Sequence, residues 1–334
     1  MRILVWHVHG GWMDGFVRGE HEYLLVLDAN GDGGRGQRDW PENVVDVPRE
    51  RVRDLDVDVV VLQRLEELDV AEELLGRRLG REVPAIFVEH NTPKADVPNS
   101  RHPLADQRDI LIAHVTQFNG LYWDCGSART TVIEHGVPDP GALYTGELPR
   151  SGVVINEPVR RWRVTGSDLI GGFAQVGPVD VFGMKADSLG EALGASPGSV
   201  VAAGDLPTPQ LHRELARRRL YLHTPRWTSL GLSLLEAMHL GMPIVGIDAT
   251  DIRRAVPPEA GCISTDVSEL HRAVARLLDD PSAARAMGRA AREFALEHFG
   301  LARFLRRWDE VLDDEVSHWL GSSARASVSA RQAG

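Results

Sequence analysis

Short apolar runs recur along this chain of 334 residues, and most of them end in a polar residue or a glycine turn. Runs this short and continuous are typical of buried parallel strands, because strands covered on both faces need no polar alternation. Helical segments lie between some of them, most clearly at 65–80. Strands that alternate with helices predict βαβ units and a parallel sheet with helices on both faces. In the first half of the chain the runs are RILVWHV, YLLVLD, DVDVVVLQ, VPAIFVEHN, DILIAHV and TTVIEHGV.

A proline- and glycine-rich stretch, GVPDPGALYTGELPRSG at 136–152, separates this series from a second one of the same kind. We therefore predict an α/β protein with two Rossmann-like, doubly wound parallel-sheet domains, at 1–145 and 151–300, that face each other across a cleft. Ligands of such sheets bind outside the carboxyl ends of the strands. The second series contains the runs GVVIN, VDVFGM, SVVAAGD, LYLHT and PIVGID, with helical segments TPQLHRELARRR, LSLLEAMHLG and VSELHRAVARLLDD.

The end of the chain is helical in pattern and then loses its apolar residues. The segments 281–299 and 301–320 both have the spacing of amphipathic helices. The helix at 301–320 is expected to cross back to the N-terminal domain. The small, polar tail at 321–334 is expected to be disordered.

Composition and charge exclude several classes of protein. A formal net charge of −11 argues against a nucleic-acid binder, which needs a basic face. Cys125 and Cys262 lie far apart, which predicts reduced thiols. The N-terminus lacks the apolar region of a secretory signal, and no window reaches the ~18 uninterrupted apolar residues that a membrane span needs. We expect a soluble, cytoplasmic protein of undetermined oligomeric state. The dominance of arginine over lysine is typical of high-GC, actinobacterial-type coding.

One acidic residue, Glu236, interrupts an otherwise apolar segment, TSLGLSLLEAMHLGMPIVG at 228–246. Ser233 and Glu236 fit a capping box, in which the glutamate accepts a hydrogen bond from a backbone N–H at the helix start. Alternatively, the backbone N–H groups of the SLGL loop and the helix N-terminus bind a diphosphate, and the carboxylate accepts hydrogen bonds from ribose hydroxyls. The spacing alone leaves both interpretations open.

The same segment resembles the signature of the retaining, GT-B glycosyltransferases of family 4 (group 1), roughly E-G-F-G-L-x-x-L-E-A-M-A-x-G-x-P-V-V. Three other stretches resemble that family in the same order: TTVIEHGVPDPGALY, LHRELARRRLYLHTPRW and LHRAVARLLDDPSAARAMGRAAREFALEHF. The resemblance covers essentially the whole chain and is strongest at 204–300. It implies transfer of a sugar, with retention, from a nucleoside diphosphate sugar (UDP- or GDP-linked) to an acceptor hydroxyl or amine, with no metal and no other cofactor.

The resemblance assigns roles to residues of the C-terminal domain. The second glutamate of the family's E-x7-E motif falls on Glu236, whose implied role is to bind the ribose hydroxyls. The first glutamate falls on Thr228, so the motif is degenerate and a hydroxyl stands where an acid faces the donor sugar. The base is expected near AAGDLPTP. The other donor-binding residues of this region are expected to be Gly204, Leu230, Gly231 and Leu232.

The family's diphosphate clamp, G-R-x4-K-G, aligns with NEPVRRWRVTG at 156–166. Arg160 takes the arginine position, but Thr165 stands where the lysine is expected. A cation is needed there because negative charge grows on the β-phosphate as the leaving group departs. Arg161, Arg163 or Lys185 can supply it, with Arg163 preferred for its closeness in sequence. The alternative is a solvated basic turn.

In the N-terminal domain, Gly10 and Gly11 match the family's glycine-rich turn near the donor phosphate and sugar. His90 matches the family histidine that points at the transferred sugar, although a histidine at a strand end is also a common polar cap. His90, Arg160 and Thr228 are thus the predicted catalytic set. We expect the acceptor near GGWMDGF and FNGLYW.

Two stretches look like metal sites and are interpreted otherwise. DANGDGGRGQRD at 28–39 fits much of a calcium loop, but its twelfth residue is aspartate and no helices flank it. His7, His9 and His21 lack helix-spaced zinc ligands. We predict no metal site.

The missing glutamate and lysine also leave a different class of protein open. A non-catalytic GT-B protein would bind a sugar nucleotide or support a partner enzyme. A sugar-nucleotide epimerase shares the fold but is less consistent with the family 4 signature.

Overall fold

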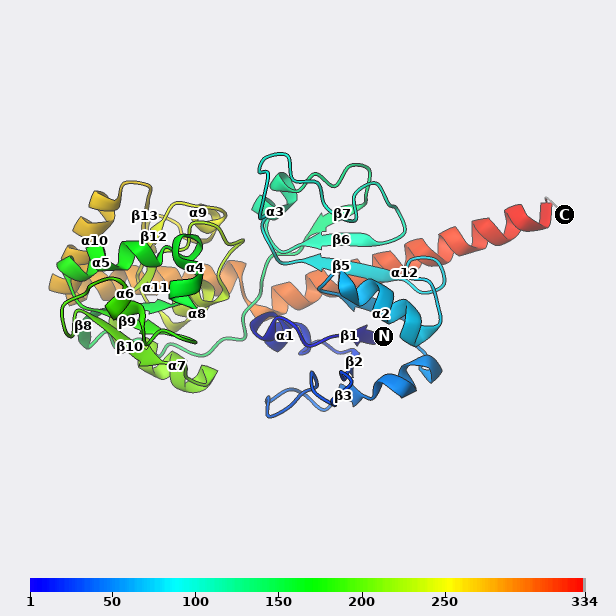
Figure 1. The fold of residues 1–334 in the computed structure, drawn as a ribbon, viewed down its shortest axis with the longest axis horizontal. Coiled ribbons are helices and arrows are strands. Elements are labelled where there is room, and N and C mark those ends of the chain that lie inside the picture. The colour runs from blue at the N-terminus through cyan, green and yellow to red at the C-terminus, as the bar shows by residue number, and fades with distance from the viewer. Residues whose placement is uncertain (333–334) are drawn as a thin grey trace. The chain divides into compact units, whose positions relative to one another are not determined.

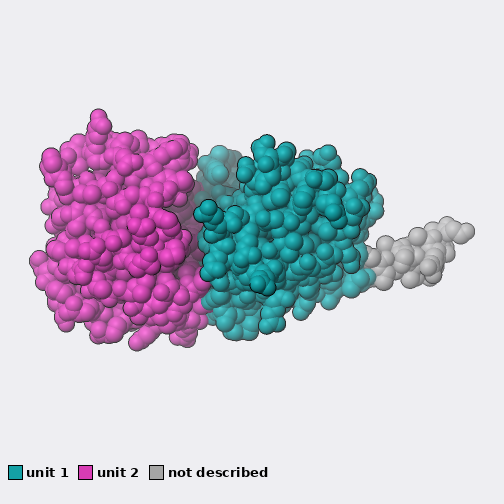
Figure 2. All heavy atoms as spheres, turned by 90° about the horizontal axis from the view of Figure 1, so that it is seen from below, with its two compact units in different colours: residues 1–136, 301–334 teal, residues 137–300 magenta. Residues whose placement is uncertain are grey.

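The structure is a computed structural model that describes the backbone of residues 1–332 and the side chains of residues 1–322 (Figure 1). It divides into two compact units, residues 1–136 with 301–334 (unit 1) and residues 137–300 (unit 2) (Figure 2). The boundary lies at the start of the proline- and glycine-rich stretch. Residues 137–145, predicted in the N-terminal domain, belong to unit 2, where the backbone N–H of Tyr144 donates to the carbonyl of Leu240 (3.1 Å).

Unit 1 is built on a seven-stranded, all-parallel sheet. Its strands are β1 (Arg2–Val5), β2 (Glu22–Val26), β3 (Val44–Val47), β4 (Val59–Leu62), β5 (Ala85–Glu89), β6 (Leu111–His114) and β7 (Thr130–Val132). Its helices are α1 (Gly10–Phe16), the 3-10 helix η1 (Arg49–Asp54), α2 (Glu66–Leu75), α3 (Gln117–Tyr122) and α12 (Leu301–Gln332). The strand order β3-β2-β1-β4-β5-β6-β7 puts the topological switch point between β1 and β4.

Unit 2 repeats this architecture with six parallel strands. The strands are β8 (Leu148–Val154), β9 (Val179–Phe182), β10 (Val200–Gly204), β11 (Arg218–His223), β12 (Ile244–Ile247) and β13 (Gly261–Ser264). The helices are α4 (Pro158–Thr165), α5 (Ser167–Val176), α6 (Leu189–Ala192), α7 (Thr208–Leu215), α8 (Leu232–Leu240), α9 (Ile252–Ala255), α10 (Val267–Asp279) and α11 (Pro281–His298). The order β10-β9-β8-β11-β12-β13 places the switch point between β8 and β11.

Each face of the unit 2 sheet has its own apolar core. Leu234 and Met238 of α8 are buried in one cluster, and Phe173 of α5 and Leu270 of α10 are buried in the other. Burial on both faces explains the continuous apolar runs, since each fully buried Leu or Phe contributes roughly 1.5–3 kcal/mol. The predicted doubly wound α/β fold is confirmed.

The long helix α12 packs on unit 1. Trp308 is almost fully buried and contacts Trp12 edge-on, with ring centroids 5.7 Å apart. Glu315, also buried, accepts two hydrogen bonds from Arg129, of 2.6 and 2.8 Å. The helix continues through Gln332, whereas a disordered tail was expected from 321. Residues 322–332 contain no proline or glycine, and their three alanines and two arginines favour helix. Residues 333–334 of that tail lie outside the described residues.

Candidate functional site

The segment that resembles the family signature forms the start of α8 at the switch point of unit 2. α8 begins at Leu232, and Gly231 is its N-cap in an extended conformation. Gly231 packs directly on His223. A Cβ added at Gly231 would lie 3.1 Å from Cε1 of that histidine. Leu230, Gly231 and Leu232 therefore form a loop that ends in a helix N-terminus at the carboxyl edge of the sheet. This arrangement favours anions.

Glu236 lies in the second turn of α8, and the capping box with Ser233 does not form. The helix starts before Ser233, whose hydroxyl instead shares a 2.9 Å hydrogen bond with the hydroxyl of Tyr221. The Glu236 carboxylate is 3.6 Å from Nε2 of His212 on α7, and its side chain is 20% exposed. It is therefore reachable from solvent and has no capping role at the start of α8.

Thr228 belongs to the same loop, which is fixed to α4 and α5. Arg226 donates two hydrogen bonds to Asp168, of 2.6 and 2.9 Å, and the Thr224 hydroxyl donates to the carbonyl of Thr165 (2.7 Å). The pairing with Arg226 holds the pKa of Asp168 below its usual range. The half-buried Thr228 is therefore carried on an anchored loop.

Position 165, where the clamp lysine was expected, is buried and has a structural role. The Thr165 hydroxyl shares a 2.8 Å hydrogen bond with the Ser167 hydroxyl. The whole residue is 2% exposed. The next residue, Gly166, has φ +68°, and a Cβ there would lie 2.0 Å from the carbonyl oxygen of Thr224. A lysine at 165 would have to place its ammonium in this packed corner, which explains why a small hydroxyl residue fits.

A different lysine lies beside Arg160. Glu157, which follows β8, accepts a hydrogen bond from Arg160 and a 3.0 Å hydrogen bond from Nζ of Lys185. These two hydrogen bonds lower the pKa of Glu157 to about 2, and the one from Arg160 has the larger effect. Arg163, the preferred substitute from the sequence, pairs with Asp168 at 3.1 Å instead. Arg161 is half-buried, and desolvation lowers its pKa. The geometry thus favours Lys185 over Arg163 as the second cation.

Hydrogen bonds between loops bring Lys185 to this position. The backbone N–H of Met184 donates to Oδ1 of Asn156 (3.0 Å), and the N–H of Glu157 donates to the carbonyl of Met184 (2.8 Å). The N–H of Gly183 donates to the carbonyl of Gly204 (3.0 Å), and Gly204 has φ +99°, a conformation that favours glycine. The loops after β8, β9 and β10 are thereby joined, and Gly204 lies at the same carboxyl edge.

In unit 1, the predicted glycine turn starts a helix beside a group of histidines. Gly10 and Gly11 are the first residues of α1, and His9 precedes them as N-cap. The rings of His9 and His90 are 4.0 Å apart, and Trp12 contacts His90 edge-on at 5.2 Å. His90 follows β5 as predicted, so the glycine turn and His90 lie together at the carboxyl edge of this sheet.

A third histidine, His135, completes this group after β7. Burial lowers the pKa of His135 to about 4, and the nearby His9 makes a smaller contribution to this shift. Burial also lowers the pKa of His90 well below its usual value, with His9 and His135 adding to the effect. These imidazoles are neutral at pH 7, so they can exchange hydrogen bonds with hydroxyl groups but carry no charge. His9 and His135 were not predicted as site residues; the signal for them in the sequence is that each follows a predicted strand.

Unit 1 also has a cavity of about 250 Å³ at its own switch point. Trp6 and His7 after β1, and Arg64 after β4, contribute to its lining. Nδ1 of His7 is 2.8 Å from the carbonyl oxygen of Gly34. Its lining residues include none of 10–16 or 118–123, the segments near which the acceptor was expected.

Within the described part of the chain, no three His, Cys, Asp or Glu side chains are arranged to hold a metal ion. In the 28–39 loop, Oδ1 of Asp28 accepts hydrogen bonds from the backbone N–H groups of Asn30 (2.8 Å) and Asp32 (2.9 Å). This carboxylate thus organises its own turn. No helix in residues 1–332 combines the length and hydropathy needed to cross a bilayer.

Comparison with known proteins supports the interpretation of unit 2. Residues 191–294 match the family model described as glycosyl transferases group 1. This range lies within unit 2 and includes Gly204, Thr228 and Glu236. No curated protein matches the chain in sequence.

Solved structures resemble most of the chain. Sucrose-phosphate synthase from Thermosynechococcus elongatus has 14% identity and a TM-score of 0.72, with 94% of this chain and 98% of that chain covered. HepE from Anabaena in complex with UDP-glucose has 17% identity and a TM-score of 0.68, covering 94% and 100%. A glycosyltransferase from Rickettsia africae has 12% identity and a TM-score of 0.65, covering 94% and 98%.

At these identities the structural likeness establishes the fold, which is GT-B. The family match in unit 2 is to a family of glycosyl transferases. The fold and the family match together support a glycosyltransferase.

Proposed function

We propose that this protein is a retaining glycosyltransferase that transfers a sugar from a UDP- or GDP-linked donor to an acceptor hydroxyl or amine. The reaction would need neither a metal ion nor another cofactor, and the protein would act in the cytoplasm. The proposal rests on the family match in unit 2 and on the polar groups at the carboxyl edges of the two sheets.

The observation that carries the proposal is the set of groups at the switch point of unit 2. A glycine loop ends in the N-terminus of α8, Glu236 follows one turn later, and Arg160 and Lys185 share one carboxylate after β8. Amides and cations suit a diphosphate, and a carboxylate suits ribose hydroxyls. In the proposed complex, Arg160 and Lys185 would exchange Glu157 for the donor's phosphates.

The chemistry assigned to these groups is charge stabilisation. The bond between the anomeric carbon and the β-phosphate oxygen breaks, the bond to the acceptor oxygen or nitrogen forms, and the acceptor proton passes to the departing phosphate. Fixed cations and amides stabilise the charge that grows on that phosphate. His90 would hydrogen-bond the transferred sugar as a neutral imidazole, and Thr228 would offer its hydroxyl to the sugar.

Calorimetric titration of UDP-, GDP- and TDP-sugars, followed by assays of donor hydrolysis and transfer, tests the proposal. Glu236→Ala should weaken nucleotide binding about 10- to 100-fold, because a hydrogen bond to a charged group is worth about 1.5–3 kcal/mol. Glu297→Ala removes an exposed carboxylate of α11 and serves as the matched control. Unchanged nucleotide affinity in Glu236→Ala would contradict the role of this residue, and NMR of the product's anomeric proton tests retention.

The second candidate is a non-catalytic GT-B protein that binds a sugar nucleotide or supports a partner enzyme. The observations that favour it are Thr228 at the expected glutamate and Thr165, buried, at the expected lysine. Tight nucleotide binding without hydrolysis or transfer, across donors and acceptors, would support this candidate.

A further inference from the structure

The Glu236 carboxylate has a buried histidine beside it. Nε2 of His212 lies 3.6 Å from Oε2 of Glu236, and the His212 side chain is 10% exposed. This nitrogen is buried and has no hydrogen-bond partner within the described residues. Most buried polar atoms in proteins are hydrogen-bonded, so an exception calls for an explanation. Its place beside the carboxylate assigned to the ribose points to a role in the donor site.

His212 belongs to the face of α7 that packs against α8. Leu215, one turn later, is buried in the same apolar cluster as Leu235 and Met238 of α8, and Leu211 packs against that cluster. His212 itself is 8% exposed. The helix that carries the imidazole is therefore anchored to the same core as the helix that carries Glu236, which fixes the two side chains relative to each other.

A hydrogen bond between the two side chains needs the proton on the histidine. Oxygens of an ionised carboxylate only accept hydrogen bonds, so the nitrogen that faces Glu236 has to be the donor. The distance of 3.6 Å is longer than the about 2.7–3.2 Å of an N–H···O hydrogen bond. A movement of about half an ångström would close the gap. It would leave Oε1 of Glu236 for the ribose hydroxyls.

We propose that His212 is a positioning residue of the donor site. When the nucleotide binds, its Nε2–H donates to Oε2 of Glu236 and holds Oε1 toward the ribose hydroxyls. A glutamate side chain has several rotatable bonds, and restricting them before binding reduces the entropy that binding costs. His212 thus raises nucleotide affinity without touching the nucleotide. The inference rests on the proposed function, which assigns the ribose to Glu236.

Calorimetric titration of the full-length protein with UDP and GDP tests this role. His212→Phe keeps a ring in the same space but removes the N–H, and should weaken nucleotide binding about 5- to 10-fold. His212→Gln places an amide N–H donor near the position of Nε2, and should keep affinity within about twofold of the unchanged protein. Equal weakening by the two substitutions would overturn the proposal, because packing and not the N–H would then be what matters.

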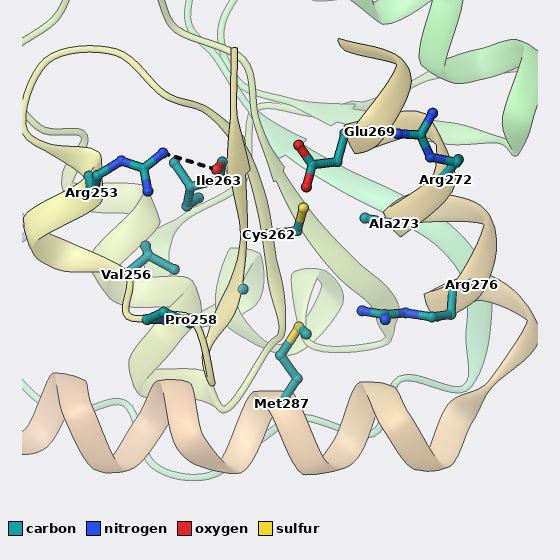
Figure 3. Close-up of a pocket in the computed structure, with 11 residues that line it drawn as sticks. Arg253, Val256, Pro258, Cys262, Ile263, Glu269, Arg272, Ala273, Arg276 and Met287 are labelled. Atoms are coloured by element: carbon teal, nitrogen blue, oxygen red, sulfur yellow. Dashed lines mark hydrogen bonds between the residues drawn. The ribbon is translucent and has the colours of Figure 1, made fainter. Parts of the chain in front are cut away.

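A second imidazole of unit 2 provides the matched control. Nε2 of His271 on α10 is also buried without a hydrogen-bond partner in the described part of the chain, and its ring contacts Phe173 edge-on at 4.7 Å. α10 lines one side of a separate cavity of about 560 Å³ along β13, two strands from β11 (Figure 3). His271→Phe should change nucleotide affinity by less than about twofold. Weakening as large as in His212→Phe would count against a specific role of His212.

A double-mutant cycle separates a direct link from two independent effects. In the Glu236→Ala background, His212→Phe should weaken binding by less than about a further twofold, because the carboxylate that it orients is absent. A further loss as large as in the unchanged background would overturn the positioning role. If Glu236→Ala alone leaves affinity unchanged, the proposed ribose site fails and this inference fails with it. If Glu236→Ala weakens binding and His212→Phe does not, only the inference on His212 fails.

Nitrogen NMR of the histidine side chains checks the hydrogen bond in the unchanged protein. At about pH 8, where an ordinary imidazole is neutral, the complex with saturating nucleotide should show His212 protonated at Nε2. The signal that disappears in His212→Gln assigns the resonance. A proton on Nδ1 in the complex would overturn the proposal, since Nε2 could not then donate to Glu236.

Discussion

The two units carry different chemistry on sheets of the same topology. At the carboxyl edge of unit 2 the polar groups are charged, and Arg160 and Lys185 share Glu157. At the corresponding edge of unit 1 they are histidines kept neutral by burial, among them His90 and His135. Fixed cations suit a diphosphate, whereas neutral imidazoles suit the hydroxyl groups of a sugar. The fold alone therefore does not determine which ligand a sheet edge binds; the loop residues do.

The largest expected effect comes from removing the cations of unit 2. Arg160→Ala with Lys185→Ala should lower kcat/KM for glycosyl transfer by about 10²- to 10³-fold, because the departing phosphate loses its fixed positive charge. Arg163→Ala is the matched control, since this arginine pairs with Asp168 instead. If Arg163→Ala lowered kcat/KM as much as the double variant, Arg160 and Lys185 would not be the cations that act on the departing phosphate.

The next largest effect concerns acid stability in unit 1. His135 has a folded pKa of about 4, below its unfolded value, so the unfolded state binds more protons as pH falls. Its contribution to stability is complete above about pH 6.5 and is lost as pH falls towards 4. Between pH 7 and 5 the free energy of unfolding should fall by about 2 kcal/mol on account of this residue.

His135→Gln should therefore flatten the pH dependence of urea denaturation between pH 7 and 5. His298→Gln, at a surface position of α11, controls for the substitution itself. An unchanged slope in His135→Gln would mean that this imidazole is not held neutral by burial.

The smallest effect is expected at Thr228. Thr228→Val should leave nucleotide affinity unchanged and lower the transfer rate about 3- to 10-fold, the value of one neutral hydrogen bond to the sugar. Calorimetry and initial rates check the two parts separately. A rate equal to that of the unchanged protein would show that this hydroxyl does not contact the sugar.

Much of the fold could be predicted from the sequence because most strands are buried on both faces. The two strands that the apolar runs do not predict, β3 and β13, are both edge strands. The middle of β3 is exposed and every residue of β13 is half-buried, so neither needs a continuous apolar run. The helical segment LSLLEAMHLG was predicted to begin at Leu232, and α8 does begin there, but the capping box of Ser233 with Glu236 does not form because Ser233 pairs with Tyr221.

The candidate site could be predicted where residues lie in one segment or match a family motif, as Gly10, Gly11 and His90 do. Glu236 and the glycine loop lie within one segment and were found together. Lys185 reaches Arg160 through hydrogen bonds between loops that follow different strands, including one made by the side chain of Asn156. Such pairing depends on the tertiary arrangement of the strands, which the local pattern does not encode. The grouping of His135 with His90 has the same origin.

The most direct test of the account is a crystal structure of the full-length protein with bound UDP or GDP. We predict that the ribose hydroxyls bind the Glu236 carboxylate, and that the phosphates contact the amides of Gly231 and Leu232 together with Arg160. A nucleotide bound only at the histidines of unit 1 would contradict the assignment of unit 2 as the donor-binding unit.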